Sequence, residues 1–344
     1  MSYDVVILGG GPAGLSAALA LGRARKRVLL CDAGPRRNAR AVHVHNFVTR
    51  DGVTPDEFRG VAREQLAQYP NVVVRDVRVA NVTGEKDRFV VTFEGDTSAA
   101  DPTDSGNTSA ADPADSGNTS AADPADSGNT SAADPADSGK TAAVQARRIL
   151  VCTGMIDEML PLDGFAELWG HSIVQCPYCH GWESRDRPWG FLASAAHSAH
   201  LTTFALQLRG WTSDVCVLTN AAFELADVTR EALVAGGLRV ETAPIVRLVA
   251  RDTQLEAIEL ADGTRVPCEL LFAHPPQSQV PFVRELGLAL DDDGFVRVDP
   301  MRRETSIPGV FAAGDSTTRM QAAIAAAASG MQAAAVMNVE LTLG

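Results

Sequence analysis

Short apolar runs separated by turns dominate the first part of the chain. Tyr3–Gly9 is an almost unbroken apolar run of strand length, and Leu15–Leu21 has the small and apolar residues of a buried helix. Val28–Cys31 is a second apolar run, and Asp32 follows it directly. This order predicts a strand, a helix and a strand, the unit from which mostly parallel α/β sheets with right-handed crossovers are built.

The turn between the first predicted strand and helix has the spacing GxGxxG, formed by Gly9, Gly11 and Gly14. In this motif the first glycine permits a tight turn, the second lets the backbone approach a pyrophosphate, and the third packs helix on strand. The phosphates then face the positive end of the helix. Asp32 follows at about the expected 20 residues and could hold a ribose hydroxyl. Three glycines alone could be a structural turn, but in this context they predict a dinucleotide site.

Two later apolar runs end in comparable turns. Ile149–Gly154 (ILVCTG) ends in Thr-Gly, and Ile307–Asp315 (IPGVFAAGD) ends in Gly-Asp before an alanine-rich helical stretch that begins at about Gln321. Taken alone, the second run is a strand followed by a turn acid. Together with the opening motif, both runs predict strand ends of one nucleotide-binding domain.

The segment CPYCH places Cys176 and Cys179 two residues apart, with His180 directly behind them. Such a pair can close a small disulfide ring, and its surroundings can lower the pKa of one thiol to ~7. The alternative is half of a zinc site, which needs a second pair of ligands such as His197 and His200. The turn-like sequence favours a redox dithiol and no metal site. The other cysteines are solitary and stand in apolar strand contexts: Cys31, Cys152, Cys216 and Cys268.

Residues Thr97–Lys140 are four tandem copies of an 11-residue unit of the type TSAADPADSGN. Each copy contains proline and glycine and lacks an apolar seam, which argues against the right-handed coiled coil that an 11-residue period can indicate. Calcium-binding β-helix repeats remain an alternative, although these bury an apolar residue in each turn. We expect a flexible acidic loop. It interrupts the predicted strand Arg88–Phe93 and its continuation Val144–Leu150, so it should extend from the first domain.

Composition limits the classes of function. The net charge of −13 argues against nucleic-acid and anionic-membrane partners, although eight aspartates and one lysine of the repeat supply −7 of it. With 45% hydrophobic and 21% charged residues, the 344-residue chain suits two globular domains. No apolar run reaches the ~20 residues of a membrane helix. The first apolar run is a strand and not a signal peptide, and the sparse cysteines suit a reducing cytoplasm.

Together these motifs resemble the low-molecular-weight thioredoxin reductase family, essentially end to end except for the repeat. The resemblance implies an α/β flavoprotein with two dinucleotide-binding domains. A discontinuous FAD domain would comprise residues 1–155 and 270–344. A nucleotide-type domain, residues 156–269, would carry the CxxC pair. Family precedent implies a homodimer.

The resemblance also assigns roles to individual residues. Cys179 would face the flavin, Cys176 would exchange with substrate, and His180 would act as acid and base. Asn46 would lie beside the flavin, and Asp315 would bind on the ribityl side. The full set of implied FAD-binding residues is Gly9, Gly11, Pro12, Ala13, Gly14, Asp32, Asn38, Asn46, Thr153, Gly154, Gly314, Asp315, Gln321 and Ala322.

The chain departs from the family where NADPH should bind. The family has a second glycine-rich turn after the strand that corresponds to Trp189–Leu192, but this chain has Ala193–Ser198 there, without glycines. After the next strand, Val215–Leu218, the turn Thr219–Ala222 has no arginine for a 2′-phosphate. We therefore expect a degenerate nucleotide domain and weak binding of NADP(H).

The motif CPYCHGWE, with the segments Arg37–Ala39 and His43–His45, resembles the flavin dithiol oxidases that close the disulfides of gliotoxin and holomycin. This resemblance implies oxidation of a dithiol through Cys176 and Cys179, with O₂ or another acceptor. The substrate would be a small-molecule dithiol or a thioredoxin-like protein. One alternative is a disulfide reductase fed by NADPH or ferredoxin. Another is a non-catalytic, redox-sensing flavoprotein.

Overall fold

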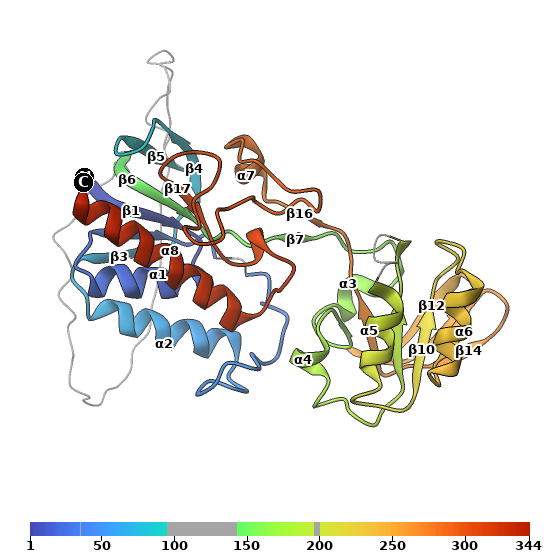
Figure 1. Cartoon of the computed structure of the whole chain (residues 1–344). Helices are drawn as coiled ribbons and strands as arrows, with labels where there is room; N and C mark the ends of the chain where they lie inside the picture. Colours follow the sequence, from blue (N-terminus) through green and yellow to red (C-terminus); the bar gives the residue numbers. More distant parts are fainter. Residues whose placement is uncertain (35, 95–142, 196–199) are drawn as a thin grey trace, which may run out of the picture.

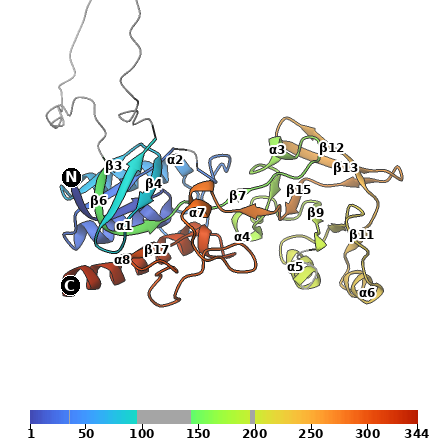
Figure 2. The same ribbon diagram turned by 90° about the horizontal axis from the view of Figure 1, so that it is seen from above.

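The chain folds into two α/β domains that lie side by side (Figures 1 and 2). The computed structural model describes residues 1–34, 36–94, 143–195 and 200–344. The repeat 97–140, expected to be a flexible loop, and part of the turn Ala193–Ser198 lie outside the described residues. Two short strands, β7 (Ile156–Asp157) and β16 (Gln277–Ser278), pair antiparallel where the chain crosses between the domains.

The first domain is built on a mainly parallel sheet with the order β3-β2-β1-β6-β17. The beginning of β6 also pairs antiparallel with a hairpin of β4 and β5. The strand, glycine turn and helix predicted at the N-terminus therefore form the first elements of this domain. The strands are β1 (Ser2–Leu8), β2 (Val28–Cys31), β3 (Val72–Arg75), β4 (Val79–Thr83), β5 (Phe89–Phe93), β6 (Val144–Val151) and β17 (Val310–Ala312).

Three helices cover one face of this sheet: α1 (Pro12–Arg23), α2 (Pro55–Ala67) and α8 (Ala323–Leu343). Strand residues alternate between the two faces, as in any pleated sheet. Val5 and Ile7 of β1 therefore pack under these helices, whereas Val6 and Leu8 pack on the side of the β4–β5 hairpin and α7 (Pro281–Glu285). This packing sets α1 against α8, and so brings the N-terminal glycine turn close to the C-terminal segment.

The second domain has a five-stranded, all-parallel sheet with the order β11-β10-β9-β15-β8. Hydrophobic cores lie on both of its faces, one shared with α5 and α6 and one with a three-stranded antiparallel sheet. The elements are β8 (Ile173–Val174), β9 (Trp189–Leu192), β10 (Val215–Leu218), β11 (Arg239–Glu241), β15 (Leu270–Ala273), β12 (Ile245–Arg251), β13 (Gln254–Leu260), β14 (Arg265–Pro267), α3 (Phe165–Leu168), α5 (Leu201–Leu208) and α6 (Asp227–Ala235).

The predicted α/β architecture with two nucleotide-binding-type domains is confirmed, with two corrections. The boundary at residue 270 is too early, because β15 (Leu270–Ala273) pairs with β8 and β9 and so completes the sheet of the second domain. The chain returns to the first domain only through β16. The second correction concerns β6, which the sequence predicts to continue β5, whereas the structure does not show this. The two strands are antiparallel neighbours, with Phe89 opposite Ala146, and the repeat connects them.

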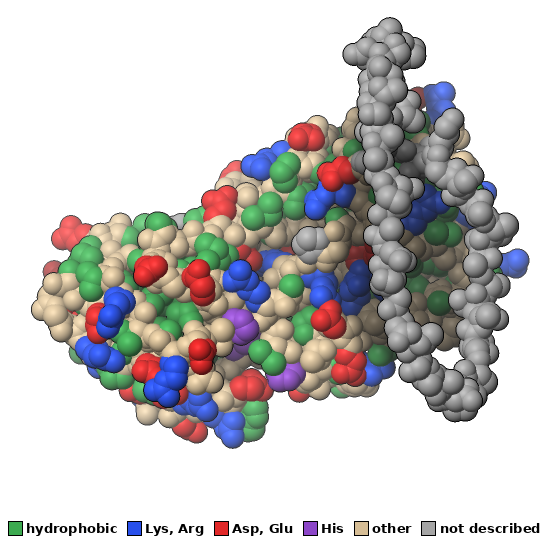
Figure 3. All heavy atoms as spheres, turned by 180° about the vertical axis from the view of Figure 1, so that it is seen from behind, with side chains coloured by type: hydrophobic (Ala, Val, Ile, Leu, Met, Phe, Trp, Pro, Cys, Tyr) green, Lys and Arg blue, Asp and Glu red, His purple; other side chains and the backbone are tan. Residues whose placement is uncertain are grey.

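No helix in the described part of the chain combines the length and apolarity that a membrane crossing requires. On the face shown in Figure 3, acidic and basic side chains are interspersed, and histidines lie near the junction of the two domains. The chemistry therefore has to be sought at this junction.

Candidate functional site: the dithiol turn and the interdomain cleft

The two cysteines of the CxxC motif lie on a short helical turn that follows β8. Cys176 precedes the helix α4 (Pro177–His180), whose first residue is a proline that is pre-organised for the start of a helix. This turn brings the two sulfur atoms to 2.8 Å from one another, with the Cys179 thiol donating to Cys176. Both side chains are partly buried. The two predicted thiols are thus in direct contact, and one short turn determines their separation.

The two thiols differ in acidity. The pKa of Cys176 is lowered to about 7, first by the hydrogen bond from Cys179 and further by the backbone N–H groups of Cys179 and Tyr178, while burial opposes the shift. The pKa of Cys179 is raised because its proton is held by Cys176, because it is buried, and because it feels the negative charges of Cys176 and Asp315. Cys176 is therefore the thiolate of the pair.

His180 faces the backbone of the dithiol turn. Its Nδ1 lies 3.4 Å from the carbonyl oxygen of Cys176. Burial lowers the pKa of His180, and the nearby His45 lowers it further, against the opposing charge of Glu183. The imidazole is thus mainly neutral at pH 7, as a base must be. His45 comes from the first domain, and its Nε2 lies 3.6 Å from Glu183 Oε1 of the second, so His45 reaches the segment just after the dithiol turn across the domain junction.

A cleft of about 1050 Å³ opens in front of the dithiol, between the two domains. Cys176 and Cys179 line one end, and the ends of β9 and β10 line the other. The walls are mostly apolar and include Leu160, Phe204 and Met320. We call this space the interdomain cleft. It connects the predicted redox pair with the part of the second domain where the thioredoxin reductase family, which the sequence resembles, would bind NADPH.

The charged side chains among the described residues that line the interdomain cleft are paired with one another. Arg319 donates two hydrogen bonds to the carboxylate of Asp293, at 3.1 and 2.6 Å. His274 lies at the end of β15, and its Nε2 is 3.1 Å from the carbonyl oxygen of Gln175. No sequence pattern marked His274 or this charged pair. Neither belongs to a motif, and only the fold brings them to the cleft.

The glycine turn has the shape that a bound phosphate requires. A Cβ on Gly14 would lie 1.9 Å from the Gly9 carbonyl oxygen, and a Cβ on Gly9 would lie 2.3 Å from the Cys152 carbonyl oxygen, so both positions are closed by backbone. A Cβ on Gly11 would meet nothing within 4 Å. The hydroxyl of Thr153 beside this turn is buried and has no hydrogen-bond partner. An open cradle next to an orphaned donor fits the phosphate and ribityl part of FAD.

The carboxylate of Asp32 lies at the end of β2, directly beside the glycine turn. A Cβ on Gly10 would come within 2.3 Å of its Oδ2. The same oxygen accepts hydrogen bonds from Nε and Nη2 of Arg59, at 3.0 and 2.6 Å, and Oδ1 accepts from the Gly34 N–H. Arg59, on α2, gave no signal in the sequence. It orients the carboxylate that the sequence predicts to hold the ribose.

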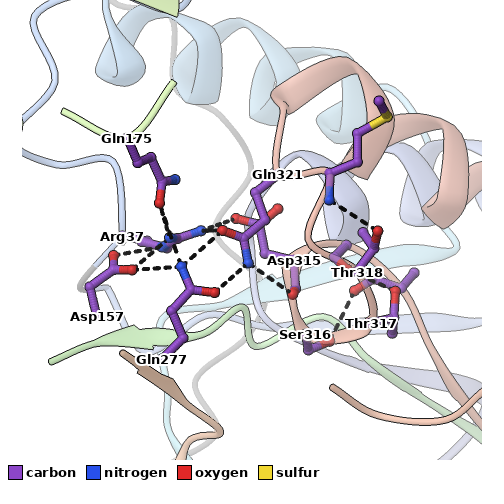
Figure 4. Close-up of polar contacts among 12 residues, drawn as sticks. Arg37, Asp157, Gln175, Gln277, Asp315, Ser316, Thr317, Thr318 and Gln321 are labelled. Atoms are coloured by element: carbon purple, nitrogen blue, oxygen red, sulfur yellow. Dashed lines mark hydrogen bonds and ion pairs between the residues drawn. The ribbon is translucent and has the colours of Figure 1, made fainter. Parts of the chain in front are cut away.

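The remaining predicted cofactor residues are divided between two places. Asp315, in a short 3₁₀ turn (Asp315–Thr317), and Gln321 meet at Arg37 in a polar cluster (Figure 4). Asn46 instead reaches across the domain junction and donates from its side-chain amide to the Tyr178 carbonyl at 2.6 Å. Pro12 and Ala13 begin α1, Gly154 follows Thr153, Gly314 precedes Asp315, Ala322 precedes α8, and Asn38 is exposed in the turn after Arg37. The FAD roles of all these residues remain predictions.

The four solitary cysteines and the histidines of the zinc alternative lie away from the dithiol where the structure describes them. All four solitary cysteines are buried, and burial raises the pKa of each, which suits inert core thiols. His197 lies outside the described residues, and His200 precedes α5 on the surface. Within the described ranges, the structure contains no group of three or more His, Cys, Asp or Glu residues that could hold a metal ion.

Comparison with known proteins agrees with this arrangement. The family model described as "Pyridine nucleotide-disulphide oxidoreductase" matches residues 3–330. The chain is 30% identical to thioredoxin reductase sirT of Leptosphaeria maculans over 98% of this chain and 94% of that protein. It is 31% identical to thioredoxin reductase tcpT of Claviceps purpurea, with the same coverage. A crystal structure of an oxidoreductase from Agrobacterium tumefaciens superposes with a TM-score of 0.80 at 30% identity, covering 100% of this chain and 99% of that one.

These relatives are similar over essentially their whole length, and the family is one of oxidoreductase enzymes that use FAD. Their shared two-domain flavoprotein architecture is the one described above for this chain. The chain belongs to the pyridine nucleotide-disulphide oxidoreductase family, as a thioredoxin reductase-like flavoprotein.

Proposed function

We propose that this protein oxidises small, neutral dithiols to disulfides through Cys176 and Cys179, with FAD as cofactor and O₂ or another oxidant as the final acceptor. One observation carries the proposal above the others: the dithiol lines a mostly apolar cleft of about 1050 Å³. Cavities that hold small ligands have volumes of about 300–1,000 Å³ and apolar walls with few polar groups. The interdomain cleft has about the upper volume of this range, and its walls are mostly apolar in area.

The charges in the cleft favour such a substrate over NADPH. Among the described residues that line it, Arg319 is the only arginine or lysine, and its guanidinium is paired with Asp293. A dinucleotide carries several phosphate charges, which proteins bind through arginine forks and glycine-turn N–H groups. The turn Ala193–Ser198 has no glycine. A neutral, apolar molecule fits this lining better.

The thiol exchange can be followed atom by atom. In the oxidised enzyme, a substrate thiolate attacks the Cys176 sulfur and displaces Cys179 as a thiolate. The second thiol of the substrate then attacks the substrate sulfur that is bonded to Cys176 and displaces Cys176. The substrate leaves as a disulfide, and the enzyme keeps two electrons as a dithiol. FAD, when bound, supplies the two-electron acceptor that restores the enzyme disulfide and passes the electrons to the oxidant.

The environment of the turn supports these steps. A Cys176 with a pKa of about 7 is both a good leaving group and a thiolate at neutral pH. His180 has a lowered pKa, and its neutral imidazole could take the proton of the incoming substrate thiol. Gly11 and the Thr153 hydroxyl would hold the phosphate and ribityl part of FAD, and Asp32 its ribose. Asp315 and Gln321 would lie towards the flavin.

A second candidate function is the reverse reaction, reduction of a thioredoxin-like protein. The names of sirT and tcpT support it. So do two exposed aromatic side chains beside the dithiol, Tyr178 at 62% and Trp182 at 66% exposure, which would suit a protein partner. Ferredoxin or NADPH would then have to supply the electrons. We place this candidate second because the apolar cleft is large enough to receive a complete small substrate.

The deciding experiment is a parallel anaerobic titration of the purified flavoprotein, followed at the flavin absorbance band. Small dithiols should bleach the flavin, and NADPH and reduced ferredoxin should do so slowly or not at all. Readmitted air should then restore the colour. Rapid bleaching by NADPH together with little response to dithiols would make the second candidate correct. The variant with both Cys176→Ser and Cys179→Ser should not respond to dithiols, and a response would place the redox site elsewhere.

A further inference from the structure

One segment of the first domain, residues 36–46, carries contacts that fasten the second domain in place. It lies between β2 and α2. The Asn46 side-chain amide donates to the Tyr178 carbonyl at 2.6 Å, inside the dithiol turn. The Arg40 guanidinium donates to the carbonyl of Ala166 in α3. We call residues 36–46 the docking segment.

Arg37 is the most highly connected residue of the docking segment (Figure 4). Its Nε and Nη2 donate to the two carboxylate oxygens of Asp157, at 2.7 and 2.6 Å. Its Nη1 donates to Asp315 at 2.9 Å and to Gln321 at 2.6 Å. Its Nη2 also donates to the side-chain oxygen of Gln175 at 3.0 Å, directly before the first cysteine of the motif. One guanidinium therefore links both domains and the crossing between them.

The crossing strands are tied into the same cluster. Asp157 lies on β7 and Gln277 on β16, opposite one another in the antiparallel pair. The Gln277 amide donates to Asp157 at 2.9 Å and to Gln321 at 3.0 Å, and Gln321 donates back to Gln277 at 2.9 Å. A shift of the crossing strands relative to the first domain would break the bonds to Gln321. Arg37 therefore holds β7 directly through Asp157, and β16 indirectly through Asp157 and Gln321.

The carboxylates of Asp157 and Asp315 require the planar, forked guanidinium group of an arginine. The side chains of Arg37 and Asp157 are only 17% and 5% exposed. Burial and the charge of Asp157 raise the pKa of Asp315, and Arg37 opposes this. Both carboxylates share this one guanidinium, whose planar fork can serve several acceptors at once. A lysine would keep the charge but could not make the same set of bonds.

We propose that Arg37 is a positioning residue that clamps the thiol-bearing domain in one orientation, with the dithiol turn held against Asn46 of the first domain and both cysteines lining the interdomain cleft. This inference rests on the proposed function for its catalytic meaning, although the clamp itself does not. In this orientation the dithiol can exchange with a substrate in the cleft.

Hydrogen exchange measured by mass spectrometry tests the clamp without any turnover. The Glu158 N–H, just after β7, donates to the Pro276 carbonyl at 2.8 Å and reports on the crossing. In Arg37→Met, peptides that cover the crossing and the dithiol turn should exchange at least about tenfold faster than in the wild type. Arg36→Met is the matched control, because Arg36 pairs with the exposed Asp56 of its own domain. It should match the wild type within about twofold.

Arg37→Lys covers the case in which the methionine variant does not fold. It should fold and show intermediate exchange, because it keeps the charge and loses the fork. Unchanged exchange at the crossing in Arg37→Lys, or in a folded Arg37→Met, would overturn the clamp. So would an equal increase in the Arg36→Met control.

A kinetic comparison separates positioning from loss of structure. In Arg37→Lys with its FAD content matched to the wild type, alkylation of reduced Cys176 should stay within about twofold, because the dithiol turn is local. Reduction of the flavin by a dithiol should slow by about tenfold or more, because the orientation is lost. Equal loss in both rates would show a general structural role and refute positioning. If the wild-type flavin does not respond to dithiols, the proposed function fails, while the exchange result still decides the clamp.

Discussion

The acidity of Cys176 gives a prediction that can be worked out from the structure. The largest cause of its lowered pKa, about 7, is the hydrogen bond from the Cys179 thiol. Cys179→Ala removes this donor. Burial and the backbone N–H groups then act in opposite directions, so we expect a pKa near that of a free thiol, ~8.5. The change of about 1.5 units corresponds to ~2 kcal/mol of lost thiolate stabilisation.

The rate of alkylation should then change in a way that depends on pH. At pH 6.5 the thiolate fraction falls from about a quarter to about one hundredth, roughly 25-fold. A more basic thiolate is also more nucleophilic, and for a Brønsted slope of about 0.45 this returns roughly a factor of five. Cys179→Ala should therefore react about fivefold more slowly than reduced wild type at pH 6.5, and about fivefold faster at pH 10. The two curves should cross near pH 8.

The assay is anaerobic alkylation by iodoacetamide between pH 5.5 and 10, followed by mass spectrometry of the peptide that contains Cys176. The four solitary cysteines are buried and have raised pKa values, so they should not interfere. Cys179→Ser keeps a hydroxyl donor and should give an intermediate curve. An inflection that stays near pH 7 in Cys179→Ala would show that the backbone N–H groups suffice. Curves that shift in height but do not cross would indicate a change of access and not of acidity.

Three further predictions concern the cofactor, the repeat and the nucleotide. Gly11→Val should abolish FAD binding in a protein that still folds, because the valine side chain would fill the open cradle, whereas Gly14→Ala should destabilise the apoprotein itself, since its Cβ would meet the Gly9 carbonyl oxygen. Flavin content and thermal unfolding separate the two effects. Normal FAD content in Gly11→Val would refute the cradle. Deleting residues 97–140 should leave flavin content and turnover nearly unchanged, because β5 and β6 are adjacent antiparallel strands and closing a loop costs only ~0.6 kcal/mol per doubling of its length; loss of folding would mean that the repeats pack. NADPH should bind two to four decades more weakly than to an intact site, because the loss of two charge-assisted hydrogen bonds costs ~3–6 kcal/mol; flavin bleaching within about a second at ~1 mM NADPH, in stopped-flow mixing, would contradict this.

The sequence alone was sufficient where the chemistry is local. The strand, glycine turn and helix around Gly9, Gly11 and Gly14 are continuous in the chain, so their pattern predicts both the structure and the open cradle. The same holds for Cys176 and Cys179, because one short turn determines their separation. Hydrophobic runs likewise predicted β2, β9 and β10, because a strand buried on both faces has to be apolar throughout.

Tertiary structure decided whatever depends on residues that are far apart in the chain. The clamp joins Arg37 to Asp157 and Asp315, which are 120 and 278 positions away, and no local pattern marks such a partner. Leu270–Ala273 has the same apolar pattern in either domain, so only strand pairing could assign it. A pattern reports whether a residue is buried, whereas the position of its partners follows from how the sheets and helices pack. Packing of the two domains creates the cleft, holds the dithiol turn against Asn46, and so determines what the dithiol can reach.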